Sequence, residues 1–298
     1  MSIMRNQLTN SVGGLLFASL IVFPGALQAQ THYPQGVEGI KGASLPPPGF
    51  YVRDYNYMYW SDTLKGGPPN FDLFAYVQAP RLIYITDVKI LGGFYGADVL
   101  VPFPYQDLTA GGFSGSKFGL GDVFVEPITL SWHPKQFDFA VGYGFWAPSG
   151  AYKPTDPVSP GKGFWTQMLT AGATWYPDEE KTWSLSLLNR YEFNQENQDT
   201  DITPGQALTM EWGIAKTFRK TIDVGMVGYY QLQTTKSTGS GAYGPASVSQ
   251  PWVVGLGPEI SMVCPKLGLI TSIRYVYEIE SRDRPQGNMV NITFTKRF

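Results

Sequence analysis

The chain has 298 residues, and its formal net charge of −2 does not favour nucleic acid as a partner. Charged residues make up only 15% of the sequence, aromatic residues make up another 15%, and there are 34 glycines. After residue 30 no apolar run reaches the roughly 20 residues of a spanning helix, which excludes a helical membrane protein. This composition suits alternating strands in a membrane, and the alternative is a secreted soluble all-β protein. The single cysteine excludes an internal disulfide.

Residues 1–29 have the composition of a signal peptide. Arg5 gives a positive start, residues 12–23 form an apolar stretch too short to span a bilayer, and residues 27–29 end on Ala29. We therefore predict export, with cleavage near Ala29–Gln30.

Residues 30–49 show no periodic pattern and contain several prolines, which predicts an irregular periplasmic leader. Two placements are open for it. The default is a leader that runs to the rim of a barrel, and the alternative is a segment that folds into the lumen.

Residues 50–298 predict an all-β fold, a single antiparallel transmembrane β-barrel of about twelve strands. Most of the expected strands are close to the roughly 9–11 residues that a tilted membrane strand needs. They are residues 50–60, 81–89, 93–103, 120–132, 137–147, 164–176, 183–194, 208–218, 222–234, 252–263, 268–279 and 288–298.

The connections between these strands alternate in length. Every second one is short, whereas those between are long, with residues 61–80, 104–119 and 148–163 among them. Outer-membrane barrels have short periplasmic turns and longer extracellular loops, and a soluble sandwich has no reason to alternate in this way. An even number of strands places both termini at the periplasmic end.

Side chains alternate clearly in some strands. In residues 183–194, Trp183, Leu185 and Leu187 share one face, and Ser184 and Ser186 lie on the other. Apolar-out and polar-in is the barrel pattern, but a soluble sandwich gives the same alternation with its apolar face inward. Tryptophans near expected strand ends favour a membrane, because their rings prefer the headgroup level; they are Trp60, Trp132, Trp146, Trp165, Trp175, Trp183 and Trp252. Pro127 predicts a bulge within its strand.

The last eleven residues resemble the closing strand of bacterial outer-membrane barrels. They alternate apolar and polar side chains and end on Phe298, the position that the barrel-assembly machinery reads in such proteins. Lys296 departs from the pattern.

Residues 38–49 read E-G-I-K-G-A-S-L-P-P-P-G, and Gly119-Leu120-Gly121-Asp122 precedes the fourth expected strand. With the closing Phe298, these features resemble the outer-membrane family named for the meta-cleavage pathway of phenol degradation. The resemblance implies a single barrel and a transporter, often encoded with genes for the catabolism of aromatic compounds. It supplies no catalytic residues.

The sequence offers little for catalysis, cofactors or metals. Only His32 and His133 could act as an imidazole base, one in the irregular leader and the other in a short turn. Neither lies where an outer-membrane lipid hydrolase needs its histidine, and the same shortage argues against a metal site. We therefore predict no enzyme and no cofactor.

Two sets of residues are candidates for the lumen. The first is a group of charges on the expected inner faces: Asp122, Glu126, Arg190, Glu192, Glu211, Asp223, Glu259, Arg274 and Glu278. Mutual pairing that fills the barrel is the favoured role, and selectivity along a pathway is the other. The excess of carboxylates in this set would disfavour anions in a water-filled lumen.

The second set is a row of aromatic residues, which we call the tyrosine row: Tyr51, Tyr55, Tyr57 and Tyr59. A lipid-facing girdle is the favoured interpretation. Stacking on an aromatic ligand in the lumen is the alternative, and Arg53 in the same row supports it.

Together these observations predict a barrel in the bacterial outer membrane, surrounded by lipid, that passes a small hydrophobic or aromatic solute by passive uptake or export. A structural or partner-binding barrel with a plugged lumen is the alternative, and a lipid hydrolase is less favoured.

Overall fold

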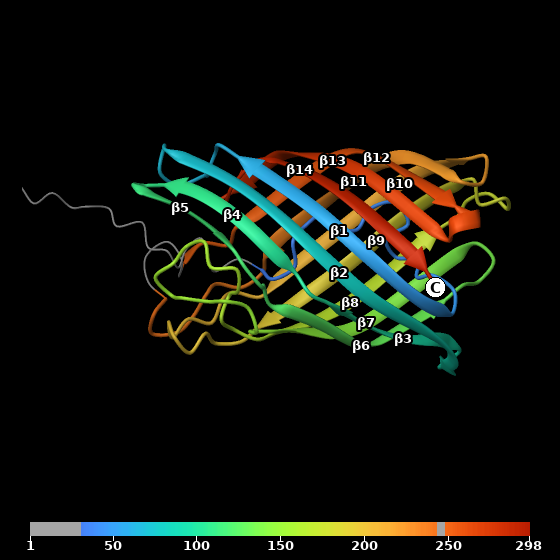
Figure 1. Ribbon diagram of the computed structural model, residues 1–298, viewed down its shortest axis with the longest axis horizontal. Coiled ribbons are helices and arrows are strands. Elements are labelled where there is room, and N and C mark those ends of the chain that lie inside the picture. Colours follow the sequence, from blue (N-terminus) through green and yellow to red (C-terminus); the bar gives the residue numbers. More distant parts are fainter. Residues whose placement is uncertain (1–30, 243–247) are drawn as a thin grey trace, which may run out of the picture.

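The computed structural model describes residues 31–242 and 248–298, and these form one closed sheet (Figure 1). The predicted signal peptide lies outside the described residues. No helix in the described part of the chain is long and apolar enough to cross a bilayer. The elements in chain order are β1 Gly49–Ser61, β2 Phe71–Ile90, β3 Gly93–Leu100, β4 Phe103–Ala110, β5 Phe113–Phe118, β6 Val123–Trp132, β7 Phe137–Ala147, β8 Thr166–Trp175, β9 Trp183–Asn194, β10 Ala207–Phe218, β11 Ile222–Gln233, β12 Trp252–Cys264, the 3-10 turn η1 Pro265–Leu267, β13 Leu269–Arg282 and β14 Asn288–Arg297.

The sheet closes because β1 pairs with β14 on one side and with β2 on the other. All pairings are antiparallel, and the closed wall has twelve strands, as the sequence predicts. The long strand β2 pairs with β4 along its first half and with β3 along its second. The hairpin of β4 and β5 therefore extends the wall at one end, while β3 pairs with β6 to continue the barrel.

Two segments predicted as loops are strands. Residues 71–80 form the first half of β2, and residues 103–118 hold β4 and β5. Pro80 lies within β2, opposite the break between β3 and β4, where its carbonyl accepts the Val101 N–H at 3.0 Å. A proline at such a break removes no ladder hydrogen bond from β3 or β4.

The alternation of short turns and long loops is confirmed. The turn between β2 and β3 is only Leu91 and Gly92, with φ of 50° and 79°, the left-handed geometry of a tight hairpin. We call this end of the barrel the turn end and the opposite end, with the long loops, the loop end. The carboxyl end of β14 lies at the turn end, to the right in Figure 1. The predicted bulge at Pro127 is also present, as a register shift between Val125 and Ile128.

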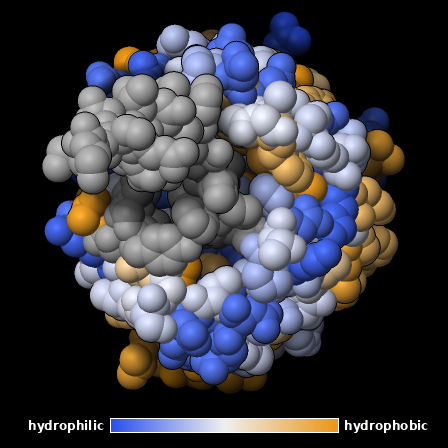
Figure 2. Space-filling model, turned by 90° about the vertical axis from the view of Figure 1, so that its left-hand side faces the viewer, coloured by the Kyte–Doolittle hydropathy of each residue, from blue (hydrophilic) through white to orange (hydrophobic). Residues whose placement is uncertain are grey.

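The outer surface is apolar and the interior is polar. Leu187, Phe193 and Tyr277 are among many large apolar side chains exposed on the outside, whereas most buried polar residues point inward. Figure 2 shows hydrophilic residues around the loop end and hydrophobic ones along the flanks. Trp60, Trp165, Trp175 and Trp183 are exposed near strand ends, as expected for headgroup contact. Trp132 and Trp252 are half-buried, and Trp146 departs from the expectation, because it is 6% exposed and lies in the lumen.

A plugged lumen as the candidate functional site

Residues 31–48, the described part of the leader, lie inside the barrel rather than at its rim, so the default placement was wrong. They form turns without helix or strand, and the segment crosses the lumen lengthwise (Figure 1, blue). Near the loop end, His32 Nε2 lies 2.9 Å from Asp122 Oδ2. Near the turn end, Lys41 Nζ lies 2.9 Å from Asp223 Oδ2. The leader therefore plugs the barrel over much of its length.

Glu38 ties the leader to opposite walls of the barrel. Its carboxylate lies 2.9 Å from Arg53 Nη1 on β1, 3.6 Å from Arg81 Nη1 on β2 and 3.8 Å from Arg190 Nη2 on β9. The hydroxyl of Tyr55 donates to the same carboxylate at 2.8 Å. These groups form a buried ionic layer across the lumen, and Glu38 is the member that the leader contributes.

Inward carboxylates on the strands accept the leader's backbone N–H groups. Glu192 Oε1 accepts from the N–H groups of His32 and Tyr33, at 2.9 and 3.0 Å. Glu259 Oε2 accepts from the Ile40 N–H at 3.0 Å. An irregular segment cannot satisfy its own backbone, and buried backbone groups need partners. The carboxylates thus supply the acceptors that a helix or strand would have supplied internally.

Leader carbonyls are satisfied in the same way by inward donors. The guanidinium of Arg274 donates to the carbonyls of Gly36 and Val37, and Asn291 Nδ2 donates to the Val37 carbonyl at 3.1 Å. Arg274 is itself paired with Glu259, Nε to Oε2, at 3.1 Å. The leader is therefore bound by a polar network whose donors and acceptors come from several strands.

Small residues let the leader approach the wall closely. A Cβ on Gly39 would lie 1.8 Å from Glu259 Oε2, and one on Gly172 would lie 2.8 Å from the Cβ of Ala43. Gly36 has a φ of +76°, and a Cβ there would meet Met289 and Tyr229. The E-G-x-x-x-A-S motif of residues 38–44 therefore has a structural reason. Glu38 pairs with the arginines of the wall, and Gly39 and Ala43 are small enough for the leader to lie against the wall.

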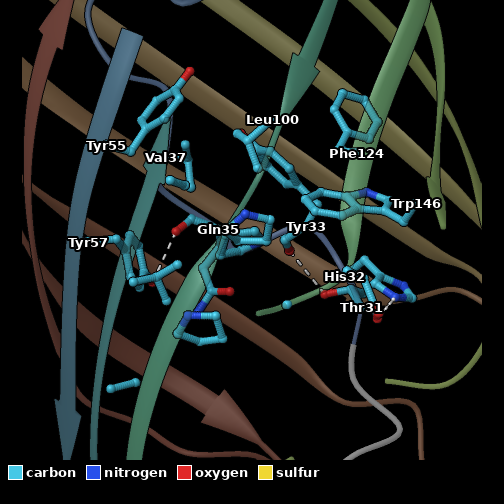
Figure 3. A pocket seen from close by; sticks show the side chains of 18 of the residues that line it. Thr31, His32, Tyr33, Gln35, Val37, Tyr55, Tyr57, Leu100, Phe124 and Trp146 are labelled. Carbon is cyan, nitrogen blue, oxygen red and sulfur yellow. Dashed lines mark hydrogen bonds and ion pairs between the residues drawn. The ribbon is translucent and has the colours of Figure 1, made fainter. Parts of the chain in front are cut away.

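A cavity of about 280 Å³ remains between the leader and the wall. Figure 3 shows the leader between Tyr55 and Tyr57 of β1 on one side and Leu100, Phe124 and Trp146 on the other. The part of the cavity wall from Leu73 to Ala79 on β2 is apolar, and Arg81 follows it on the same strand. The plug therefore leaves a partly apolar space in an otherwise polar lumen.

His32 and Glu38 are leader side chains with shifted pKa values. Burial lowers the pKa of His32 from 6.5 to about 4, although the hydrogen bond to Asp122 opposes the shift, so the ring is neutral at pH 7. Lys162 also faces this ring and lowers its pKa further. Burial alone would raise the pKa of Glu38, but the nearby guanidinium groups outweigh it and hold that pKa at about 2. The docked leader thus carries a neutral imidazole and an ionised carboxylate.

Residues 54–294 match the family described as "Putative MetA-pathway of phenol degradation". The chain belongs to this family. No curated protein matches the chain.

Among solved structures, the chain is similar to an outer-membrane channel from Pseudomonas putida F1, with a TM-score of 0.75 and 13% identity over 90% of this chain and 100% of that one. It is also similar to the translocator domain of an autotransporter from Neisseria meningitidis, with a TM-score of 0.52 and 9% identity over 86% and 91% of the two chains. The β domain of a Bordetella autotransporter gives a TM-score of 0.51 and 12% identity over 84% and 99%. These likenesses show that this member of the phenol-degradation family has the fold of outer-membrane barrels.

In this family member, all nine charges predicted to face the lumen are buried there. They are Asp122, Glu126, Arg190, Glu192, Glu211, Asp223, Glu259, Arg274 and Glu278. Most bind one another or the leader; Glu211 Oε2, for example, accepts from the Tyr33 hydroxyl at 2.6 Å. These contacts agree with the role that the sequence favoured for the nine charges, which is mutual pairing that fills the barrel.

The tyrosine row faces the lumen, so the expectation of a lipid-facing girdle was wrong. All four rings are buried, and Arg53 in the same row reaches Glu38. Tyr55, Tyr57 and Tyr59 line the cavity, whereas the Tyr51 hydroxyl donates to the Pro47 carbonyl nearer the turn end. The misassignment has a local cause, because Asp54 and Asn56 occupy the opposite face of β1 and hide its apolar–polar contrast.

Sequence reasoning missed several charged residues of the lumen, among them Glu38, Arg81, Asp98 and Arg284. Arg81 Nε and Nη2 donate to the two oxygens of Asp98, both at 2.7 Å, and Nη2 also donates to Glu126 at 2.8 Å. Arg81 lies in an expected strand that does not alternate cleanly, and Glu38 and Arg284 lie outside the strands, so period-2 patterning gave no signal for these three residues. Glu38 is the first residue of the motif at residues 38–49, but the motif alone does not show which side chains Glu38 contacts.

Each histidine contacts an aspartate side chain. His133 Nδ1 lies 2.9 Å from Asp138 Oδ1 at a short turn, away from the lumen cavity. His32 Nδ1 lies 2.8 Å from Thr166 Oγ1, but that hydroxyl is fully buried and already hydrogen-bonded to Asn194 at 2.6 Å. Among the described residues, no cluster of three or more His, Cys, Asp or Glu side chains could hold a metal.

Proposed function

We propose that this barrel lets a small apolar or aromatic compound cross the bacterial outer membrane passively, through the space between the leader and the β1–β2 wall. The observation that carries the proposal is the cavity of about 280 Å³, whose lining combines apolar wall residues with three tyrosines. Aromatic and apolar linings suit ligands of the same kind. Membership in a family named for phenol degradation agrees with such a solute.

The polar network of the leader supports this route for the solute. Glu38 of the leader is paired with arginines on β1, β2 and β9. These paired side chains fill the part of the lumen around Glu38. Any solute must use the residual space or move the leader. Passive passage of a solute requires no cofactor and no covalent step, so we propose no enzymatic activity.

Uptake and release of labelled solute by proteoliposomes tests the proposal. We expect faster exchange of small neutral aromatics with the barrel than without it, and no acceleration of a disaccharide too large for the cavity. Equal rates with and without the protein for every small aromatic would refute it.

The second candidate is a structural or partner-binding barrel whose lumen stays plugged. The extent of the leader's hydrogen bonding favours this alternative, since each backbone contact from His32 to Ile40 must break before the leader moves. Planar-bilayer recordings separate the two candidates, because a permanently sealed barrel passes no ionic current and gives no solute exchange.

The location and assembly of the protein follow from the same proposal. We expect signal-peptide cleavage near Ala29–Gln30, insertion into lipid, and recognition of Phe298 by the barrel-assembly machinery. The Phe298 N–H donates to the Phe50 carbonyl at 3.0 Å, and the residue is 72% exposed, which leaves the ring available for recognition.

A further inference from the structure

Charges that line the cavity are mainly positive, in contrast to the lumen as a whole. Four cationic side chains line it, Arg81, Lys162, Arg190 and Arg284, against the two carboxylates of Glu38 and Asp122. The sequence-based expectation that the lumen disfavours anions counted inward carboxylates along the whole barrel. Most of those carboxylates bind the leader or an arginine, so they do not set the charge that a solute in the cavity would meet.

Both carboxylates of the cavity are already engaged. Glu38 is paired with three arginines. Asp122 accepts from the backbone N–H groups of Gly150 and Lys162, at 2.9 and 2.7 Å, and faces the ring of His32. A cationic solute would therefore find no carboxylate without a partner in this lining.

Arg284 differs from the other arginines of the lumen. It lies in the loop between β13 and β14 and is only 7% exposed. Its Nη1 donates to Gln231 Oε1 at 2.8 Å, but its buried Nε has no hydrogen-bond partner among the described residues. Within the same described part of the chain, no carboxylate lies within 4.0 Å of this guanidinium, whereas Arg81, Arg190 and Arg274 each have one.

A buried guanidinium without a carboxylate is costly, because it has lost water and gained no opposite charge. A ligand carboxylate is the group that best matches a guanidinium in shape and charge. Another part of the lining is apolar, with Leu73, Leu100 and Phe124 on β2, β3 and β6. The volume of about 280 Å³ lies at the small end of ligand pockets, enough for one ring.

We propose that the cavity binds small apolar carboxylates, such as a carboxylate on a single aromatic ring, with the carboxylate on Arg284 and the apolar body against the β2–β3–β6 wall. This inference rests on the proposed passage function and adds that the solute is an anion. It predicts preference for the anion over a neutral or cationic compound of the same shape.

The test is calorimetric binding of three probes of matched size to the full-length protein in detergent at pH 7. The probes are benzoate, benzyl alcohol and benzylammonium. We expect benzoate to bind at least about tenfold more tightly than benzyl alcohol, the usual contribution of a charge-assisted hydrogen bond. Benzylammonium should bind least. Equal affinity for benzoate and benzyl alcohol in the wild-type protein would overturn the inference, and this comparison needs no variant.

Substitution of Arg284 then assigns the preference to that residue. Arg284→Gln should weaken benzoate binding by about tenfold or more while leaving benzyl alcohol unchanged, and Arg284→Lys should keep part of the preference. Arg282→Gln is the matched control, because Arg282 is an exposed neighbour whose guanidinium donates to the Gln250 carbonyl, at 2.7 Å. A benzoate affinity that survives Arg284→Gln in a folded, heat-modifiable barrel would overturn the inference.

Exchange of the same probes in proteoliposomes separates this inference from the proposed function. If the barrel accelerates benzyl alcohol but not benzoate, passage stands and the anion preference falls. If it accelerates none of the probes, the passage function itself falls. Faster exchange of benzoate than of benzyl alcohol, lost in Arg284→Gln and kept in Arg282→Gln, is the result expected.

Discussion

Replacing Glu38 with glutamine should release the leader without unfolding the barrel. The substitution keeps the size of the side chain and removes the charge that faces three arginines. Arg81 and Arg190 keep other carboxylates, at Asp98 and Glu211, at 2.7 and 3.1 Å. Arg53 keeps only hydrogen bonds, to Thr295 Oγ1 at 2.9 Å and to the Tyr55 hydroxyl.

The expected cost follows from these contacts. Removing one partner of a buried ion pair destabilises by about 3–5 kcal/mol, and the 30% exposure of the Arg53 side chain argues for the lower end, about 3 kcal/mol. This cost falls on docking of the leader, because Glu38 takes no part in the strand ladders. About 3 kcal/mol corresponds to roughly a hundredfold larger undocked population.

Hydrogen exchange of leader amides and planar-bilayer conductance measure this change. We expect faster exchange at residues 32–40 and more frequent or larger open events, with unchanged heat-modifiable mobility of the barrel. Glu179→Gln is the control, since Glu179 pairs with Lys135 at a site where both side chains are more than 70% exposed and such pairs contribute little. Leader protection and conductance equal to wild type in Glu38→Gln would refute the assigned role of the ionic layer.

Three further predictions concern the leader and the carboxyl terminus. Lowering the pH from 7 to 5 should weaken leader docking by about 2 kcal/mol, because an undocked His32 binds a proton below pH 6.5 and the docked ring only below about pH 4. The variant His32→Gln should lose this pH dependence between pH 6.5 and 4. A pH profile of amide exchange in the variant identical to that of the wild type would contradict the role of His32. Gly39→Leu should displace the leader, because its Cβ would lie 1.8 Å from Glu259 Oε2; wild-type amide protection in this variant would count against a close fit. Deleting Phe298 should lower the yield of barrel in the outer-membrane fraction far more than the stability of barrel refolded in detergent, since the residue is 72% exposed and its ring centroid lies 6.0 Å from that of Phe50. Equal losses in both assays would mean that Phe298 acts through packing.

The sequence by itself determined the class of the fold. Side-chain alternation, as in β9 from Trp183 to Asn194, places apolar residues outward and polar residues inward, and turn and loop lengths orient the barrel. Both signals are local, because a strand has a period of two and a tight hairpin needs residues such as Leu91 and Gly92. The inward charges were predictable for the same reason.

Only the tertiary structure decided where the leader goes and which face of β1 meets the lumen. An aperiodic segment has no face of its own, and the partners of its backbone come from residues far away in sequence, as Glu192 does for His32 at a separation of 160 residues. In β1 both faces carry aromatic and polar side chains, so period-2 patterning groups the tyrosine row without saying where it points. Trp146 points inward from β7 and packs against Phe124 of β6, with ring centroids 4.9 Å apart. This contact exists only once β6 and β7 are paired. Closure of the sheet around the leader supplies these contacts, and no local pattern contains them.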